Sequence, residues 1–482
     1  MNRNRLKPAV IGTLFALLLG GIVFGIGQHS ALGGEKVDAQ SLTPKGTPTA
    51  AEKRAVFSRV WSLFNENYPD FQEKVINWKQ EKIAYEPKAM AAQTWPDFFQ
   101  VVQNMISTLH DSHSGLMGAP LPQRYWPFLF TQVFANQVVV MAAPGNSAVH
   151  PGMIVLGMNG KPLTDVLQSS YSDWFRPLGP QVQTLFETPK DVPEKITFQN
   201  PQTHVVQTVS MPVFSAQKLS QLWSGFSSQH PKYTYDPAFQ LLFFEMKTFS
   251  AKVRSLTSSS QVVFRQFGKG ILYIHIPLMT DTLEAQLKSH MNEILKAKGL
   301  ILDLRDNPGG RSEPGVWFTD HLYTHSEVPL LSRTYHHGSF SVWDHAVLLP
   351  LKPHISAPTA VLINSSDASS AEMFVAQLGD APNVKTFGSR TMGADGNPRL
   401  YPVMKGVQVR ISGWQETVTA TGQPIEQVGI APDETISWSM PQVKKYIDSL
   451  EGNADPLTLD PVVQAGKNWI LSRQPRTASL NG

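Results

Sequence analysis

The stretch Thr359-Ala-Val-Leu-Ile-Asn-Ser-Ser-Asp-Ala-Ser369-Ser-Ala-Glu372-Met-Phe374 carries the most information about the fold of this chain. Its apolar run, 359–363, predicts a buried strand, and the periodic apolar residues of 373–378 predict a helix. Ser369 therefore lies at the turn, where free backbone N–H groups at the positive end of a helix can hold a developing oxyanion. This geometry suits acyl transfer, although Ser369-x-x-Glu372 is also a capping box, which closes helices in any protein.

Strands and helices alternate around this stretch. Strands are predicted at 262–264, 271–276 and 299–304, and helices at 282–298 and 315–325. Such alternation predicts an α/β fold class with a layered αβ core. We assign residues 217–436 to this core, and residues 437–482, which include a predicted helix at 461–472, to a C-terminal helical tail.

Two regions precede the core. Apolar residues recur at helical spacing between Val56 and Phe64 and between Phe98 and Leu109, so 51–118 is predicted to be an N-terminal helical region. Residues 119–216 are predicted to be a β-rich domain, in which Asn159-Gly160 is a hairpin-type turn signal. The part from Val139 to Leu163 resembles the middle of a PDZ domain, a module that binds extended peptide ends by strand addition. A small β-insertion without a ligand is the equal alternative.

Composition excludes several classes of function. A chain of 482 residues with 41% hydrophobic and 10% aromatic residues is long enough for two or three globular domains. The formal net charge is only +3, with no long basic run, so nothing supports nucleic-acid binding. There are no cysteines, and the 14 histidines form no metal-binding spacing. We therefore expect no metal and no other cofactor.

The N-terminus has the pattern of an export segment. Arg3, Arg5 and Lys7 precede an uncharged, largely apolar run from Ala9 to Gly27. Residues 1–34 are predicted to be either a signal peptide or a membrane anchor, because the run is nearly long enough to span a bilayer. Residues 35–50 are predicted to be a linker. The rest of the chain is expected in the periplasm or outside the cell.

Three further segments contain residues that could complete a site around Ser369. The strand ending at Asp303-Leu-Arg-Asp-Asn-Pro-Gly-Gly310 leads into a paired-glycine turn, which can aim the backbone N–H of Gly310, beside that of Ser370, at an oxyanion. His113, in a polar loop, is the candidate base, since imidazole titrates near neutral pH. Glu426 could orient that imidazole. Taken singly, each has a plainer explanation: an ordinary turn, a structural histidine and a surface acid.

Together these segments resemble the tail-specific (C-terminal processing) serine peptidase family, in its tricorn-like branch. The resemblance rests, in family order, on Val60 to Phe71, Asp111 to Gly115, Leu302 to Gly310, Ser369-x-x-Glu372, Gly388 to Gly393 and Gly429 to Asp433. It implies a crotonase-like core. It also implies these roles: Ser369 as nucleophile, His113 as general base, Ser112 and Glu426 as orienting and polarising groups, and Gly310 and Ser370 as backbone oxyanion donors.

The chain departs from the family pattern at two positions. Where one branch of the family has a catalytic lysine after its Thr-x-Gly block, this chain has Ala394, so the resemblance implies a serine, histidine and glutamate arrangement instead. Pro308 replaces a glycine that is usual in the turn and removes one N–H, but the aligned donor is Gly310.

The sequence therefore predicts an exported serine endopeptidase that hydrolyses polypeptides through an acyl-enzyme on Ser369. The PDZ-like region would hold an extended peptide or its C-terminus. The alternative, motivated by the missing lysine and by Pro308, is a non-catalytic protein that binds peptides or apolar ligands on the same fold.

Overall fold

The computed structural model describes residues 44, 46–135, 137–170, 186–230, 233–236, 241–244, 261–452 and 454–474. The predicted export segment, 1–34, and most of the predicted linker lie outside the described residues. No helix in the described ranges is both long and apolar enough to span a membrane.

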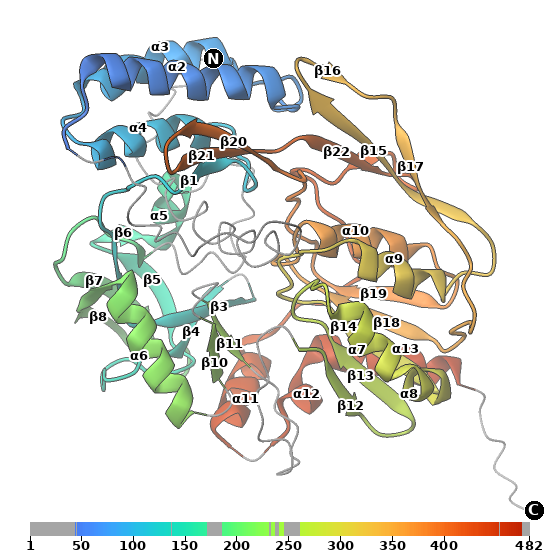
Figure 1. The fold of residues 1–482 in the computed structure, drawn as a ribbon. Coiled ribbons are helices and arrows are strands. Elements are labelled where there is room, and N and C mark those ends of the chain that lie inside the picture. Colours follow the sequence, from blue (N-terminus) through green and yellow to red (C-terminus); the bar gives the residue numbers. More distant parts are fainter. Residues whose placement is uncertain are drawn as a thin grey trace, which may run out of the picture.

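The N-terminal region consists of three helices, α2 (Ala50–Asn67), α3 (Trp78–Ala91) and α4 (Trp95–Ser107). Their apolar faces share one cluster with a small antiparallel sheet of order β1-β21-β20, formed by β1 (Gly115–Met117), β21 (Val407–Ile411) and β20 (Arg399–Met404). Because β20 and β21 come from the C-terminal half of the chain, this sheet anchors the helices to the core (Figure 1).

The β-rich region is built on a sheet of order β3-β4-β5-β7-β8, with β6 paired to β5. Asn159 and Gly160, with φ of 52° and 78°, form the predicted hairpin turn between β5 and β6. Helix α5 (Leu163–Ser170) contributes Val166 to the cluster on one face of the sheet. The strands are β3 (Phe130–Phe134), β4 (Gln137–Ala142), β5 (Ile154–Met158), β6 (Lys161–Pro162), β7 (Glu194–Gln199) and β8 (Val206–Met211).

Five further elements adjoin this region. Strands β2 (Tyr125–Pro127) and β9 (Val213–Ser215) pair antiparallel, and helix α6 (Ala216–Gln229) follows β9 directly. Strands β10 (Tyr233–Asp236) and β11 (Leu241–Phe244) form a separate two-stranded sheet.

The core is a six-stranded sheet of order β12-β13-β14-β18-β19-β24, in which only β12 is antiparallel to its neighbour. The central strands β14 and β18 are buried at every position, as strands covered on both faces must be. The strands are β12 (Val263–Gln266), β13 (Ile271–His275), β14 (Gly299–Asp303), β18 (Thr359–Ile363), β19 (Val384–Gly388) and β24 (Glu434–Thr435).

Helices cover both faces of this sheet (Figure 1). One face packs against α7 (Leu283–Ser289), α8 (Met291–Lys296), α9 (Glu313–Asp320) and α10 (Ser370–Gly379). The other face packs against α12 (Pro456–Leu459) and α13 (Pro461–Arg473). The α/β fold class with a layered core is therefore confirmed. The helix predicted at 282–298 is instead two helices that break at His290, and α9 ends five residues before the predicted position 325.

A second sheet, of order β16-β15-β22-β23 with β17 also paired to β15, packs against the far side of α10 through Leu330, Met373 and Ile425. Its strands are β15 (Glu327–His336), β16 (Ser339–Phe340), β17 (Asp344–Leu348), β22 (Trp414–Val418) and β23 (Gln423–Pro424). In the tail, α11 (Met440–Glu451) packs against β3, β4 and α6.

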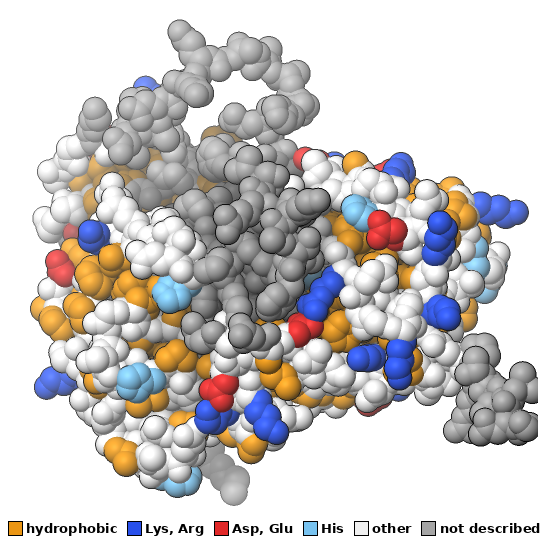
Figure 2. Space-filling model, turned by 90° about the horizontal axis from the view of Figure 1, so that it is seen from below, with side chains coloured by type: hydrophobic (Ala, Val, Ile, Leu, Met, Phe, Trp, Pro, Cys, Tyr) orange, Lys and Arg blue, Asp and Glu red, His pale blue; other side chains and the backbone are white. Residues whose placement is uncertain are grey.

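On the face shown in Figure 2, basic side chains are dispersed among acidic, neutral and hydrophobic ones and do not merge into one basic patch.

Candidate active site

Ser369 lies at the turn between β18 and α10, as the sequence predicts. Its backbone has φ 58° and ψ −131°, a combination that residues other than glycine rarely adopt and that recurs at functional sites. Its neighbours Ser366 and Ser370 are buried, with 5% and 3% of their surface exposed, whereas Ser369 is only half-buried. Of these three hydroxyl groups, that of Ser369 is therefore the most accessible.

The glycine turn after β14 packs directly against Ser369. At Gly309 (φ 96°), an added side-chain carbon would lie 2.8 Å from Ser369 Cβ and 3.0 Å from Ser370 N. At Gly310 (φ 133°), such a carbon would lie 2.1 Å from the carbonyl oxygen of Met279. Only glycine fits either position, since a contact below 3.0 Å forces the neighbouring backbone to move.

The two predicted oxyanion donors remain available. Within the described residues, neither Gly310 N–H nor Ser370 N–H has a hydrogen-bond acceptor. The Asn307 side chain, which accepts from Gly309 N (2.9 Å) and donates to the carbonyl of Ile276 (2.9 Å), holds the turn. Pro308 leaves this arrangement intact, so the turn can form without the glycine that is usual there.

His113 is buried, with 4% of its surface exposed, in the loop between α4 and β1. Asp111 accepts a bond from His113 N (2.8 Å), and Arg410 of β21 donates to the carbonyl groups of His113 (2.7 Å) and Ser112 (2.9 Å). Ser112 Oγ lies 3.4 Å from His113 Nδ1. Burial, together with the positive charge of Arg410, lowers the pKa of His113 to about 4, so its imidazole is neutral near pH 7 and can accept a proton.

The segment Gly393–Gly396 connects the serine to the histidine. Ser369 N donates to the carbonyl of Ala394 (2.8 Å), and a side-chain carbon at Gly396 would lie 3.2 Å from His113 Cβ. Ala394 itself is buried, with 1% of its surface exposed, and offers no proton acceptor at the position of the family's lysine. Within the described residues, no hydrogen bond joins Ser369 Oγ to the His113 ring.

Glu372 attaches this segment to α10. Its carboxylate accepts four hydrogen bonds, from Ser369 N (3.2 Å), Thr391 Oγ1 (2.6 Å), Gly393 N (2.7 Å) and Ala394 N (2.8 Å). Burial raises the pKa of Glu372 to about 8, against the opposing effect of these bonds. The capping explanation therefore also holds in part, because Glu372 does cap the helix start, while Ser369 stays half-exposed.

The Glu426 side chain, of which 10% is exposed, lies close to the histidine loop, and it bonds to groups other than the imidazole. Its Oε1 lies 2.6 Å from Lys74 Nζ, and its Oε2 accepts from Asp395 N (2.9 Å). Burial raises the pKa of Glu426 well above the usual range, and the charge of Lys74 opposes this effect. Glu426 is therefore not the solvated surface acid of the plainer explanation.

Sequence reasoning missed Lys74, Arg410 and the structural role of Asp111. The role of Asp111 could have been predicted, because Asp111 directly precedes Ser112 and His113 in the sequence. Nothing in the local patterns around Lys74 or Arg410 distinguishes them from other basic residues, since both act through contacts that are distant in sequence.

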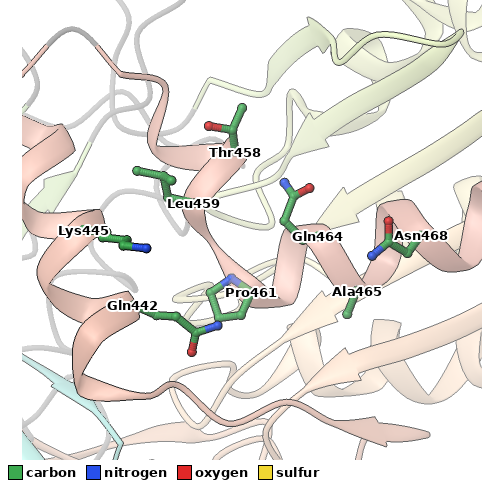
Figure 3. Close-up of a pocket in the computed structure, with 8 residues that line it drawn as sticks. All are labelled: Gln442, Lys445, Thr458, Leu459, Pro461, Gln464, Ala465 and Asn468. Atoms are coloured by element: carbon green, nitrogen blue, oxygen red, sulfur yellow. The ribbon is translucent and has the colours of Figure 1, made fainter.

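The pocket of Figure 3 lies elsewhere, between α11 and the pair α12 and α13. It has a volume of 460 Å³, and none of the six candidate residues contributes to its lining. The lining residues are Gln442, Lys445, Thr458, Leu459, Pro461, Gln464, Ala465 and Asn468.

Comparison with known proteins places two domain families on the chain. Residues 270–436 match peptidase family S41, and residues 49–107 match the tricorn protease C1 domain. The chain is 29% identical over 182 residues to the carboxy-terminal processing protease CtpA of Bacillus subtilis, covering 36% of this chain and 37% of that protein. It is 26% identical over 209 residues to a carboxy-terminal-processing protease of Bartonella bacilliformis, covering 42% and 47%.

These relatives are matched over less than half of their own length. Among solved structures, mature CPAF complexed with lactacystin matches with a TM-score of 0.60 and 15% identity, covering 86% of this chain and 99% of that one. At this identity, the likeness shows a shared fold.

Proposed function

We propose, from the premise that this chain belongs to peptidase family S41 and carries a tricorn protease C1 domain, that it is a serine endopeptidase acting on polypeptides. The observation that carries the proposal is the half-exposed Ser369 on strained backbone at the start of α10, with the glycine turn packed against it. A capping serine without another role needs no such strain.

In the proposed reaction, Ser369 Oγ attacks the carbonyl carbon of a peptide bond, and its proton passes to the neutral imidazole of His113. The C–N bond then breaks, and the amine leaves with that proton. A water molecule next gives its proton to His113 and attacks the acyl-enzyme, which releases the carboxylic acid and restores the serine. Ser112 and Glu426 orient and polarise the imidazole.

Gly310 and Ser370 supply the oxyanion donors in this proposal. Support comes from their two N–H groups, which have no acceptor within the described residues. A single such donor contributes about 3 kcal/mol to transition-state stabilisation, but only when it points at the oxyanion. In this proposal, the glycine turn and the turn at Ser369 are constrained because they aim the two N–H groups.

The experiment that tests this function uses a fluorophosphonate probe and an unfolded polypeptide substrate. We expect the probe to label the chain and the polypeptide to be cleaved. Both activities should fall at least a hundredfold in Ser369→Ala and strongly in His113→Ala, because each loses a reacting group. Ser365→Ala, in the same loop, is the matched control and should keep both activities. Full cleavage by Ser369→Ala would refute the assignment.

One observation favours the alternative of a non-catalytic binding protein. His113 and Ser369 share no hydrogen bond within the described residues, although resting sites are often loose in this respect. The same probe discriminates between the two: a correctly folded chain that is not labelled at any pH would support the binding protein.

Two parts of the proposal concern delivery of the substrate and location. The β3–β8 sheet with α5 supports a site for an extended peptide or its C-terminus; equal affinity for a free and an amidated C-terminus would exclude recognition of the carboxylate. The basic start and apolar run of 1–34 support export, with or without a retained anchor. An alkaline phosphatase fused after residue 50 should be active outside the cytoplasm, and inactivity would argue against export.

A further inference from the structure

Lys74 is a buried lysine in the turn that follows α2. Backbone bonds from Lys74 N to Asp70 O (3.0 Å) and from Ile76 N to Phe71 O (2.9 Å) close the turn. Only 2% of the Lys74 side chain is exposed. A buried ammonium group is costly unless it is paired, so its partners show what the site requires.

The partners of Lys74 come from both sides of the candidate site. Its Nζ lies 2.6 Å from Glu426 Oε1 and donates to the carbonyl of His110 at 3.2 Å. The carboxylates of Asp70 and Asp111 face the same ammonium group, and the ring of Tyr68 lies 5.6 Å away. One side chain therefore joins the turn after α2, the loop that carries His113 and the segment that carries Glu426.

Each of the three segments that Lys74 joins contains a residue with strained backbone. Val75, next to Lys74, has φ 54°; His110 has φ 51°; and Gln427, next to Glu426, has φ 63°. Positive φ is especially unfavourable for the β-branched Val75. Strain of this kind persists only where surrounding contacts impose it, and it concentrates at functional sites.

We infer that Lys74 is a positioning residue of the reaction, which holds the carboxylate of Glu426 in place beside the loop of His113. The inference rests on the proposed function. Glu426 is fixed at both oxygens, by Lys74 Nζ on one and by Asp395 N on the other. The position of the carboxylate is therefore set by Lys74 and Asp395, neither of which is among the six candidate residues.

Lys74 also sets the charge balance around His113. The groups that act on the imidazole are Arg410 and Lys74, which favour its neutral form, and Asp111, which favours the protonated form. Around Glu426, Lys74 favours the ionised form, whereas Asp70 and Asp111 disfavour it. Removing the charge of Lys74 should therefore raise the pH at which His113 loses its proton.

The test measures the rate of fluorophosphonate labelling against pH in the full chain. Labelling forms an Oγ–P bond at Ser369 and releases fluoride, while His113 takes the serine proton, so the acid limb reports the titration of His113. In Lys74→Met we expect this limb to move to higher pH by about half a unit or more and the plateau rate to fall about tenfold. Lys74→Arg keeps the charge and should keep the midpoint, even if the rate falls.

Lys53→Met is the matched control, because Lys53 is buried in the same helical region but donates to the carbonyl groups of Met90 and Ala92 and, within the part of the chain that the structure describes, to no carboxylate. It should lower stability without moving the midpoint. An unmoved midpoint in a folded, labelled Lys74→Met would overturn the inference and leave the proposed function standing. An unlabelled wild type would instead refute the proposed function.

If Lys74→Met does not fold, Glu426→Gln and the pair Lys74→Met with Glu426→Gln replace it, since the pair leaves no unpaired charge at this contact. We expect the pair to be labelled at the same plateau rate as Glu426→Gln alone, because Lys74 positions the reacting groups through Glu426. A further tenfold loss in the pair would contradict the inference.

Discussion

At the scale of single residues, the candidate site depends on how closely two backbones approach. Gly309 lies where any side chain would collide with Ala368 O, at 2.6 Å, and with Ser369 Cβ, at 2.8 Å. The positive φ of Ser369 and the glycine at position 309 therefore belong together. With this backbone conformation Ser369 packs against Gly309, and only a residue without a side chain fits there.

This close approach predicts the effect of Gly309→Ala. The added methyl group should displace Ser369 and the adjacent N–H of Ser370, so fluorophosphonate labelling should fall at least tenfold. Gly152→Ala is the control, because Gly152 has a similar φ, 90° against 96°, but no atom within 4 Å of an added carbon. Both variants carry backbone strain of about 1 kcal/mol, and only the first meets a clash. Equal labelling of the two variants would contradict this role of the glycine turn.

At the scale of elements, helix α10 organises the site through its first turn. Glu372 binds the segment from Thr391 to Ala394. Two residues further on, Gly396 packs close to His113. The helix start, the buried segment and the histidine loop thus form one continuous structure, although they belong to different parts of the chain.

We predict that Glu372→Gln disrupts this connection. Each carboxylate oxygen of Glu372 accepts two of the four bonds, so either orientation of a glutamine places its NH₂ group against donors. We expect urea unfolding to show a loss of about 1–3 kcal/mol and labelling to fall with it. Glu313→Gln, in the exposed first turn of α9, should change stability by less than about 0.5 kcal/mol. A neutral effect of Glu372→Gln would mean that the bonds to Glu372 contribute nothing net.

At the scale of the whole molecule, several acidic side chains are buried. Burial raises the pKa of Asp70 to about 6, of Glu187 and Asp395 to about 7 and of Glu372 to about 8. Asp70 belongs to the N-terminal region and Asp395 to the core, and the charge of Asp70 helps to raise the pKa of Asp395. These groups make the cohesion of the molecule dependent on pH.

The sign of this dependence follows from linkage. A carboxyl group with a raised folded pKa stabilises the fold fully below its unfolded pKa, near 4, and this contribution is lost as pH rises through the folded value. His113, with its pKa lowered to about 4, acts oppositely, adding stability as pH rises from about 4 to about 6.5.

Above pH 6.5 only the effect of the carboxyl groups remains, so the free energy of unfolding in urea should fall between pH 6.5 and 8.5. Asp395→Asn should flatten this slope. Stability that rises over this range would show that the buried carboxyl groups are ionised without cost.

Local patterns in the sequence predicted much of this architecture. The strand–turn–helix at Ser369, the paired-glycine turn at Gly310 and the hairpin at Asn159 each depend on residues a few positions apart, whose spacing records which face of an element is buried. The layered αβ core followed from the order of such elements. The break between the two helices at His290 could not be predicted, because the apolar periodicity of 282–298 continues through it.

Only the tertiary structure decided what the side chains meet. Glu426 was predicted to orient His113, and the tertiary structure adds a partner that the sequence did not indicate, Lys74, which lies 352 positions away in the chain. Arg410 reaches the loop of His113 from β21 across a similar separation. Spacing within an element cannot encode such pairs, because a contact between distant segments depends on how all the intervening elements pack. The residue types of the candidate site could therefore be proposed from the sequence, whereas their contacts and the direction of their pKa shifts depend on burial and packing.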